Sequence, residues 1–223
     1  NGIKRVQNMI SFVRKLYKVV PFVKDGGWGS TILEPTSRFA GSTVGLYGFG
    51  SISKRVAKKL SGFDVNVIAS DPFVTQEEAD KYNVKMVDFE TLLKTSDYIS
   101  IHAPLLESTK GIFNEKAFKN MKPSAYIINT ARGGLINQDD LYKALKENWI
   151  AGAALDVLEN EPPTEKDREI VKLPNTTVTS HCAFYSEESS EQQIKMTAEE
   201  VGRILRGEKP INVVNREVLS RVD

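Results

Sequence analysis

Cysteine and histidine are scarce in this sequence. Of its 223 residues, one is a cysteine and two are histidines. A single cysteine cannot form an internal disulfide or a cysteine-based zinc cluster, which excludes a disulfide-stapled secreted scaffold and fits a reducing cytoplasm. No apolar run approaches the roughly 18 residues of a membrane-spanning helix, and the N-terminus lacks a signal-peptide pattern. We therefore expect a cytoplasmic protein with no membrane partner and no metal site.

An excess of charge of one sign is missing as well. Thirty basic side chains stand against 29 acidic ones, so the formal net charge is +1. Nucleic-acid binding needs a basic stripe that neutralises phosphates, and this composition does not supply one. The hydrophobic fraction of 40% is close to that of a globular protein. The length predicts one large domain, or one domain plus part of another.

The first 42 residues predict a helix followed by a loop. Apolar residues recur at spacings of three and four over residues 6–20, and Pro21 follows, as in an amphipathic helix that ends at a proline. Several glycines and prolines between Lys24 and Ser42 then predict a long loop. This loop is the best candidate for a domain boundary.

Beyond residue 42, short apolar runs alternate with segments of helical period. Strands are predicted at residues 43–47, 65–69, 84–86, 98–101, 125–129, 151–155 and 176–179. Helices are predicted at residues 52–60, 76–82, 89–94, 115–120, 138–147 and 187–205. This order indicates an α/β protein whose parallel sheet is covered on both faces. We predict a Rossmann-type doubly wound sheet of about seven strands over residues 43–185, followed by a helix and tail over residues 186–223.

A glycine turn follows the first predicted strand directly and opens the next helix. Its sequence is Gly48-Phe49-Gly50-Ser51-Ile52-Ser53. In a dinucleotide-binding fingerprint, the first glycine permits a tight turn and the second lets the backbone approach a pyrophosphate at the helix N-terminus. Ser53 stands where the fingerprint has its third glycine, and it is small enough for close packing of helix against strand. Because a glycine-rich turn can also be simple turn chemistry, the prediction of a cofactor needs a second feature.

Asp71 supplies that feature. It ends the second predicted strand, 21 residues after Gly50, where a carboxylate can accept hydrogen bonds from ribose hydroxyls. The same negative charge would repel a 2′-phosphate, so the predicted cofactor is NAD rather than NADP. An NTPase phosphate loop does not fit, because Lys54 does not follow a glycine. The alternative is that Asp71-Pro72 is only a turn.

Four more polar residues follow the carboxyl ends of predicted strands. They are His102, Arg132, Glu161 and His181. Ligands of open α/β sheets bind at this edge. Taken singly, His102 could be a buried histidine of the core, and Arg132 and Glu161 could be surface ion-pair partners. We predict instead that these groups converge on the nucleotide crevice.

Several motifs follow one another along the chain. They are Gly48 to Ser53 with Asp71, His102-Ala103-Pro104-Leu105, Asn129-Thr130-Ala131-Arg132-Gly133-Gly134, Ala154-Leu155-Asp156-Val157 with Glu161-Pro162, and His181-Cys182-Ala183. They resemble the NAD-binding portion of the D-isomer-specific 2-hydroxyacid dehydrogenases, a family that includes phosphoglycerate, D-lactate, glycerate and formate dehydrogenases. The resemblance covers about residues 3–215. The run from His181 to Glu187 also resembles the branch with the C-terminal-binding corepressors, in which a tryptophan usually replaces Phe184.

The resemblance implies an oxidoreductase that moves a hydride between NAD(H) and a 2-hydroxy or 2-oxo acid. It makes His181 the acid/base, Glu161 its carboxylate partner and Arg132 the residue that binds the substrate carboxylate. The residues that it assigns to the cofactor are Gly48, Gly50, Ser51, Ile52, Asp71, His102, Ala103, Pro104, Thr109, Thr130, Ala131, Asp156, His181 and Ala183, with Thr130, Ala131 and Asp156 beside the nicotinamide.

These implied roles agree with the chemistry of the residue types. Reduction of a 2-oxo acid creates alkoxide charge, so a protonated imidazole within reach of the carbonyl oxygen is required, and His181 can supply it. The guanidinium of Arg132 can fix a carboxylate at two points. Cys182 is expected to have no catalytic role, because adjacent residues of an extended segment point to opposite sides.

The family also carries a substrate domain ahead of its long first helix. Only 42 residues precede the first predicted strand, so the chain looks like a cofactor domain that lacks most of its substrate domain. Residues 1–42 and 186–223 would be linking and return segments that pack toward that domain. We therefore expect NAD(H) binding but poor turnover by this chain alone. The resemblance further implies a homodimer, with the helix at residues 6–20 and the Trp28 loop near its interface.

Two other functions remain open at this point. One is an NAD(H)-binding, corepressor-like or regulatory module without significant turnover, since the corepressor branch retains Arg132, Glu161 and His181. The other is a structural Rossmann domain that binds no cofactor.

Overall fold

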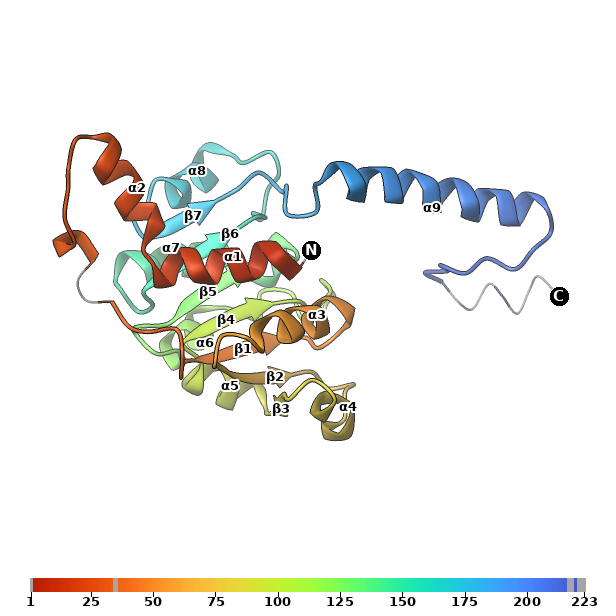
Figure 1. The fold of residues 1–223 in the computed structure, drawn as a ribbon, viewed down its shortest axis with the longest axis horizontal. Helices are drawn as coiled ribbons and strands as arrows, with labels where there is room; N and C mark the ends of the chain where they lie inside the picture. Colours follow the sequence, from red (N-terminus) through yellow and green to blue (C-terminus); the bar gives the residue numbers. More distant parts are fainter. Residues whose placement is uncertain (1, 34–35, 216–218, 220–223) are drawn as a thin grey trace. The chain divides into compact units, whose positions relative to one another are not determined.

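The computed structural model describes residues 2–33, 36–215 and 219 and divides into two compact units. The first unit, Asn1–Ala183, is a sheet with helices packed on both of its faces (Figure 1), and the second, Phe184–Asp223, contains the long helix α9 (Glu187–Leu205). None of the helices in these described stretches has the length and apolar character needed to cross a bilayer.

Seven strands form one parallel sheet in the order β3-β2-β1-β4-β5-β6-β7. The strands are β1 (Thr43–Tyr47), β2 (Asn66–Ser70), β3 (Lys85–Met86), β4 (Tyr98–Ile101), β5 (Tyr126–Asn129), β6 (Gly152–Leu155) and β7 (Thr176–Val178). Each lies within one residue of its predicted bounds, and the predicted Rossmann-type doubly wound sheet is confirmed.

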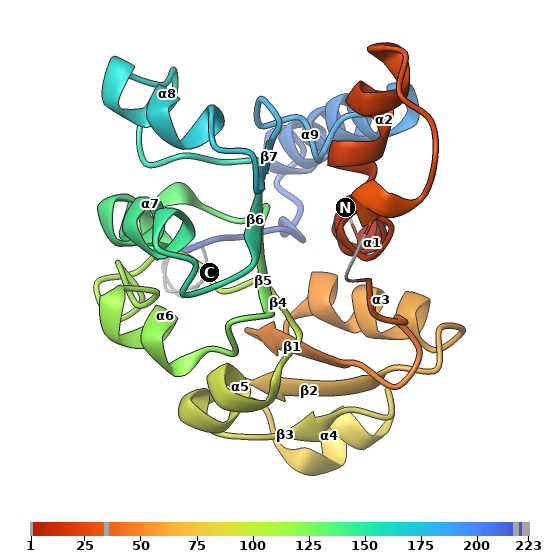
Figure 2. The same ribbon diagram turned by 90° about the vertical axis from the view of Figure 1, so that its left-hand side faces the viewer.

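Helices cover both faces of this sheet (Figure 2). The helices of the first unit are α1 (Gly2–Val13), α2 (Leu16–Lys24), α3 (Ser51–Leu60), α4 (Gln76–Asp80), α5 (Phe89–Thr95), α6 (Glu115–Asn120), α7 (Gln138–Lys146) and α8 (Glu165–Val171), with short 3-10 turns at Thr31–Leu33 and Gly133–Leu135. Figure 2 shows α1 and α3 on one face and α5, α6 and α7 on the other.

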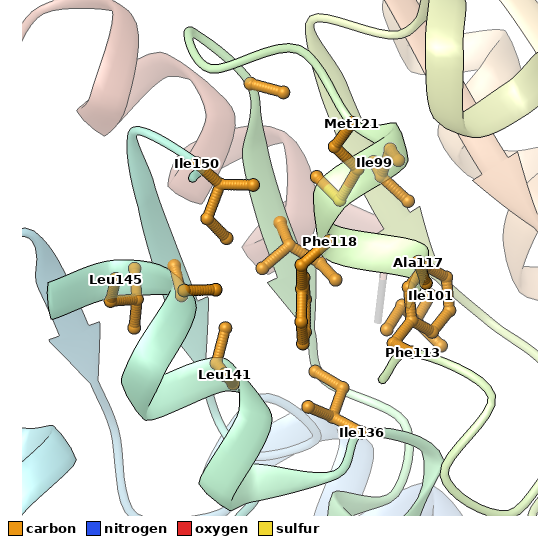
Figure 3. Close-up of a cluster of buried hydrophobic side chains, with 14 of the residues drawn as sticks. Ile99, Ile101, Phe113, Ala117, Phe118, Met121, Ile136, Leu141, Leu145 and Ile150 are labelled. Carbon is orange, nitrogen blue, oxygen red and sulfur yellow. The ribbon is translucent and has the colours of Figure 1, made fainter. Parts of the chain in front are cut away.

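The core consists of two hydrophobic clusters, one on each face. Phe118 of α6 stands inside the cluster drawn in Figure 3, and Met9 of α1 belongs to the other. Ile127 of β5 joins the Phe118 cluster, whereas its neighbour Ile128 joins the Met9 cluster. Consecutive strand residues face opposite sides, so a strand covered on both faces is apolar throughout. This explains why the apolar runs located the strands so closely.

Two predictions about helices were wrong. The N-terminal segment does not form one helix that ends at Pro21: it breaks at Lys15, whose φ of 45° is left-handed, and Pro21 lies inside α2. Helix α8 was missed, because Ile170 is its one buried hydrophobic residue and no apolar periodicity marks it. A capping box that joins Thr164 and Asp167 opens α8 and is the sequence signal that could have revealed it.

Helix α9 has the bounds that were predicted for it. Ser186 caps its first turn, since Ser189 N donates to Ser186 Oγ at 3.0 Å and Ser186 N donates to Ser189 Oγ at 2.8 Å. The helix ends just before Gly207, which has a φ of 71°. A glycine with positive φ after the last helical residue is a common helix stop.

The candidate site lies where the strand order of the sheet reverses. Strand β1 lies between β2 and β4. The chain connections leave β1 and β4 in opposite directions, so a crevice forms beyond the carboxyl ends of these two strands. Ligands of doubly wound sheets bind in such a crevice. Gly48 directly follows β1 and His102 directly follows β4.

Candidate active site

The glycine turn after β1 is shaped by a close approach to the loop after β4. Gly48 has a φ of 88°, and a Cβ at this position would lie 2.7 Å from the backbone nitrogen of Ala103. Both facts require glycine. Ser53 is fully buried and its hydroxyl donates to the carbonyl of Gly48, so it holds the turn closed in addition to packing helix against strand. The sequence predicted the packing but not the hydrogen bond.

The N-terminus of α3 fits a pyrophosphate. Gly50 is its N-cap residue and no side chain caps the helix, so the first-turn amides are not used by a capping group. A Cβ added to Gly50 would meet nothing within 4 Å, which leaves open space above the turn. Amides and the positive dipole end of a ten-residue helix, facing open space, are suited to an anion. The predicted residues Ser51 and Ile52 form the first turn of this helix.

Asp71 stands one residue beyond β2 and is tied to the same turn. Its Oδ2 accepts from Phe49 N at 2.7 Å, and its Oδ1 accepts from Phe73 N at 2.9 Å. The carboxylate is partly exposed, and each of its oxygens can accept a further hydrogen bond. Asp71 therefore orients the glycine turn and still presents a negative charge beside it, where the ribose of a dinucleotide is expected.

The loop after β4 is held by its own hydrogen bonds. His102 N donates to Tyr47 O at 2.7 Å, which joins the loop to β1. Thr109 Oγ donates to Pro104 O at 2.7 Å and accepts from Leu106 N at 2.8 Å. Both ring nitrogens of His102 are buried and find no hydrogen-bond partner among the described residues. Burial first, and the charge of Arg5 second, hold the pKa of His102 well below its ordinary value, so this imidazole is neutral.

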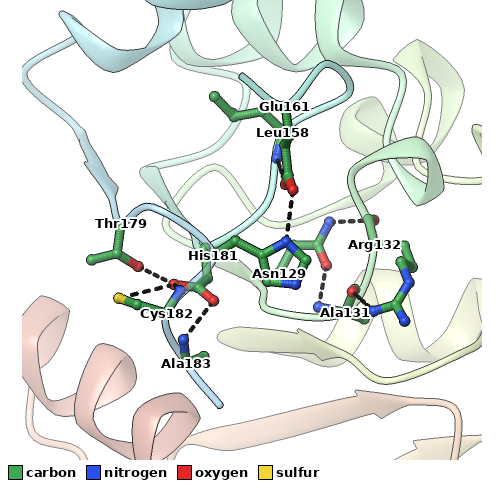
Figure 4. A network of polar contacts seen from close by, with 10 residues as sticks. Asn129, Ala131, Arg132, Leu158, Glu161, Thr179, His181, Cys182 and Ala183 are labelled. Atoms are coloured by element: carbon green, nitrogen blue, oxygen red, sulfur yellow. Dashed lines mark hydrogen bonds and ion pairs between the residues drawn. The ribbon is translucent and has the colours of Figure 1, made fainter. Parts of the chain in front are cut away.

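The loop after β5 carries Arg132 and is fixed by Asn129. The Asn129 side chain donates to Arg132 O at 2.9 Å and accepts from Ala131 N at 3.0 Å (Figure 4). The guanidinium of Arg132 is exposed and donates to Ala131 O at 2.7 Å. A Cβ on Gly133 would lie 1.8 Å from Leu158 O, so this glycine lets the Arg132 loop pack directly against the loop that carries Glu161.

His181 and Glu161 form a direct contact. His181 Nδ1 lies 2.6 Å from Glu161 Oε2 (Figure 4), and the other oxygen of Glu161 accepts from Leu158 N at 3.0 Å. The two side chains are partly exposed, at 48% and 37%. A carboxylate that engages Nδ1 fixes the orientation of the ring and assigns proton exchange with a substrate to Nε2. A pocket of about 510 Å³ adjoins this pair and is lined by both residues.

Asp156 holds the loop on which His181 sits. It is 1% exposed and accepts from Ala183 N at 2.8 Å, from Cys182 N at 3.1 Å and from the hydroxyl of Thr179. His181 N donates to Asp156 O at 2.8 Å. These bonds keep His181 at a left-handed φ of 51°, a conformation that is uncommon outside glycine.

The expectation that His181 and Cys182 lie in an extended segment was wrong. The segment is not extended at His181, so alternation of side chains along a strand does not apply there. Cys182 Sγ lies 3.8 Å from Asp156 Oδ1. The lack of a catalytic role for Cys182 stays a prediction.

The structure thus brings the predicted residues to one edge of the sheet, on the loops after β1, β2, β4, β5, β6 and β7. The sequence did not predict the residues that hold these loops, namely Asn129, Gly133, Leu158 and Thr179. It also missed Arg5 of α1, which is 3% exposed and donates to Thr130 O at 3.1 Å. A cation four residues before the buried Met9, on the apolar face of the helix, was the available signal.

Comparison with known proteins yields one family. The family model described as "D-isomer specific 2-hydroxyacid dehydrogenase, NAD binding domain" matches residues 6–183. A glyoxylate reductase of Thermococcus litoralis is 36% identical over 95% of this chain and 65% of its own length. A D-3-phosphoglycerate dehydrogenase of Archaeoglobus fulgidus is 36% identical over 93% of this chain and 39% of its own length. The chain therefore spans less than two thirds of each of these relatives.

Solved structures agree. The NAD-complexed D-isomer specific 2-hydroxyacid dehydrogenase of Lactobacillus delbrueckii ssp. bulgaricus superposes with a TM-score of 0.85 at 33% identity, covering 96% of this chain and 69% of that one. The D-lactate dehydrogenase of Lactobacillus jensenii with NAD+ gives a TM-score of 0.86 at 29% identity, covering 96% and 68%.

Proposed function

Because this chain belongs to the D-isomer specific 2-hydroxyacid dehydrogenases, whose NAD-binding domain it contains, we propose that it binds NAD(H) and serves hydride transfer between that cofactor and a 2-hydroxy or 2-oxo acid. The observation that carries the proposal is the contact of 2.6 Å between His181 Nδ1 and Glu161 Oε2, at the same sheet edge as the glycine turn. A regulatory module without turnover is not favoured, since the relatives named above are dehydrogenases and reductases.

The cofactor-binding residues divide into three groups along the crevice. The glycine turn and the first turn of α3, with Gly48, Gly50, Ser51 and Ile52, would hold the pyrophosphate. Asp71 would accept from the ribose hydroxyls, with the loop of His102, Ala103, Pro104 and Thr109 beside the crevice. Thr130, Ala131, Asp156, His181 and Ala183 would surround the nicotinamide. When bound, NAD(H) supplies or accepts the hydride.

The remaining chemistry belongs to side chains of this protein. His181 would deliver a proton from Nε2 to the carbonyl oxygen during reduction, and remove it from the hydroxyl during oxidation. Glu161 would fix the orientation of the imidazole through its contact with Nδ1. Arg132 would hold the substrate carboxylate in its fork, which sets the face that the substrate presents to the nicotinamide.

A turnover assay tests this function. The protein is incubated with NADH and a panel of 2-oxo acids such as glyoxylate, pyruvate and hydroxypyruvate, and absorbance at the NADH band is followed. We expect His181→Ala to lose most turnover while its NADH affinity stays close to that of the unchanged protein. Turnover by His181→Ala equal to that of the unchanged protein would show that His181 is not the acid/base.

Two further proposals concern these 223 residues. A polypeptide of this length is expected to bind NADH but to turn over 2-oxo acids slowly, because it spans less than two thirds of the relatives named above, and residues outside that span would also contact the substrate carboxylate. Rapid NADH oxidation by this chain would contradict that expectation. The domain division into residues 1–42, 43–185 and 186–223 also remains a proposal.

The protein is further proposed to be a homodimer that works in the cytoplasm. Apolar side chains on and after α2 support the dimer, since Leu16, Val20 and Val23 are more than two fifths exposed and Trp28 is 89% exposed. Light scattering after size-exclusion chromatography measures the oligomeric state, and a monomer at micromolar concentration would contradict it. The single cysteine supports the location, which cell fractionation tests.

A further inference from the structure

A buried cation sits beneath the loops at the carboxyl edge of the sheet. Arg5 lies in the first half of α1, is 3% exposed, and donates from Nη2 to Thr130 O at 3.1 Å. Figure 1 shows α1 running beside β5. An arginine is among the residues least often fully buried, and it is retained in an interior only where partners compensate the loss of water. The burial of Arg5 therefore requires a partner that compensates its charge.

Charge compensation for Arg5 comes from Asp156. Burial lowers the pKa of Arg5 to about 10, and the negative charge of Asp156 acts in the opposite direction. At neutral pH the guanidinium is still charged. The carboxylate of Asp156 accepts from Ala183 N, Cys182 N and the Thr179 hydroxyl. Arg5, which contacts the residue after β5, and Asp156, which directly follows β6, are therefore buried groups of opposite charge that act on each other.

Two polar groups near Arg5 carry no charge. His102 is neutral, since burial and Arg5 both lower its pKa. The Thr130 hydroxyl is buried and finds no hydrogen-bond partner within the described residues. A buried hydroxyl and a buried imidazole that lack partners are costly, and they indicate a place where a polar group from outside the chain can bind.

We propose that Arg5 shifts the relative affinity of this site toward NADH and away from NAD+, by placing a fixed positive charge beside the residues proposed to hold the nicotinamide. The inference rests on the proposed function, which puts the nicotinamide near Thr130, Ala131 and Asp156. The nicotinamide ring is positively charged in NAD+ and neutral in NADH. A cation nearby raises the free energy of the oxidised form alone, whereas Asp156 lowers it. Arg5 offsets the pull of Asp156 and thereby sets the balance.

The low exposure of Arg5 determines how strongly its charge changes the affinity for NAD+ relative to that for NADH. Water screens charges on a surface, but a pair of groups in the interior interacts through a much lower effective dielectric constant. Arg132 also carries a positive charge at this edge, but its side chain is exposed. Arg5 and Asp156 are therefore the two charges of this edge that act on the redox form of the cofactor from the interior.

The experiment compares cofactor affinities in charge variants. Dissociation constants for NADH and NAD+ are measured by calorimetry for the unchanged protein, Arg5→Met, Arg5→Gln and Arg5→Lys. The matched control is Arg14→Met, which removes an exposed charge just after the same helix. We expect the ratio Kd(NAD+)/Kd(NADH) to fall about tenfold in Arg5→Met and Arg5→Gln, as for one unit charge acting over several ångströms in an interior. Arg5→Lys and Arg14→Met should keep the ratio.

A purely structural role for Arg5 predicts a different pattern. Loss of packing would weaken both cofactors by the same factor and leave the ratio unchanged, and that result would overturn the proposal. An equal change of ratio in Arg5→Lys would also overturn it, because lysine keeps the charge. If Arg5→Met does not fold, the ratio is measured in Arg5→Gln, which retains a donor for Thr130 O. Absence of any cofactor binding by the unchanged protein would instead refute the proposed function.

Discussion

His181 Nδ1 and Glu161 Oε2 lie 2.6 Å apart although 20 residues separate them in the sequence. The contact arises because β6 and β7 are adjacent parallel strands, so the loops that follow them start at the same edge of the sheet. Asp156 fixes one of these loops through Ala183 and Cys182, and Leu158 fixes Glu161 itself. The pair is therefore held in place by contacts within the chain itself, as an acid/base with a positioned carboxylate requires.

Removal of the carboxylate should slow turnover without affecting cofactor binding. In Glu161→Gln we expect kcat to fall about 100-fold, because general acid–base catalysis by an oriented imidazole contributes on that order. Steady-state kinetics with NADH and a 2-oxo acid measures the loss. Glu159→Gln is the control, since Glu159 is an exposed carboxylate in the same loop. Equal kcat values for Glu161→Gln and the unchanged protein would contradict the assigned role.

The two glycines of the turn should respond differently to alanine. Gly48→Ala forces a side chain into a left-handed conformation and against Ala103, and should reduce the free energy of unfolding by about 1–3 kcal/mol. Gly50→Ala has room within the protein and should fold with unchanged stability, but it should weaken NADH binding because its methyl group would occupy the cradle. Urea denaturation and NADH titration check both results.

Gly62→Ala serves as the control for the glycine variants. Gly62 has no atom within 4 Å of its added Cβ and lies in the turn after α3. If Gly50→Ala bound NADH as tightly as Gly62→Ala, the pyrophosphate would not lie above the glycine turn.

The charge of Asp71 should determine cofactor selectivity. Asp71→Asn retains an oxygen that can accept from Phe49 N but removes the negative charge. We expect the preference for NADH over NADPH to fall about tenfold, since repulsion of a 2′-phosphate is lost. Ratios of dissociation constants measure the change, with the exposed Asp80→Asn as the control. An unaltered ratio would mean that another group excludes the 2′-phosphate.

Asp167 should stabilise the fold at neutral pH and lose this effect in acid. Burial acts to raise its pKa, but hydrogen bonds from Thr164, Gln138 and Asn160 outweigh burial and lower it. A carboxyl whose pKa is lower in the folded state adds stability above its unfolded pKa of about 4 and loses it as the pH falls below.

The variant Asp167→Ala measures that contribution. It should lower the free energy of unfolding by about 1–2 kcal/mol at pH 7, as expected for a lost helix cap, and by less below pH 4. Asp139→Ala removes an exposed ion pair with Lys166 and should change stability by less than about 0.5 kcal/mol. A loss for Asp167→Ala that stays constant into acid would contradict the ionised hydrogen-bonded state.

The sequence predicted the sheet better than it predicted the N-terminal helices. Strands such as β5 are buried on both faces, so their apolar runs are unmistakable and their ends were found within a residue. The break at Lys15 was not predictable, because a left-handed lysine leaves no pattern in the sequence. Helix α8 was missed because hydrogen bonds to Asp167, rather than a repeated apolar face, hold its start.

The site shows a similar division. Residues with distinctive chemistry, such as His181 and Arg132, could be predicted from their places after strands. Asn129 and Asp156 also stand in the predicted motifs, but their positioning roles could not be predicted, because they act through backbone atoms of segments that only the folded chain brings near. Gly133 is a further example, since only the folded structure reveals that a side chain there would collide with Leu158.

Titration of the purified protein with NADH, followed by the fluorescence of the bound cofactor, measures whether the crevice at the glycine turn holds NAD(H). We expect saturable binding of one NADH per chain in the micromolar range for the unchanged protein and for Gly62→Ala. A Gly50→Ala variant of equal stability should bind clearly more weakly. Absence of saturable binding by the unchanged, folded protein would show that this crevice is not a site for NAD(H).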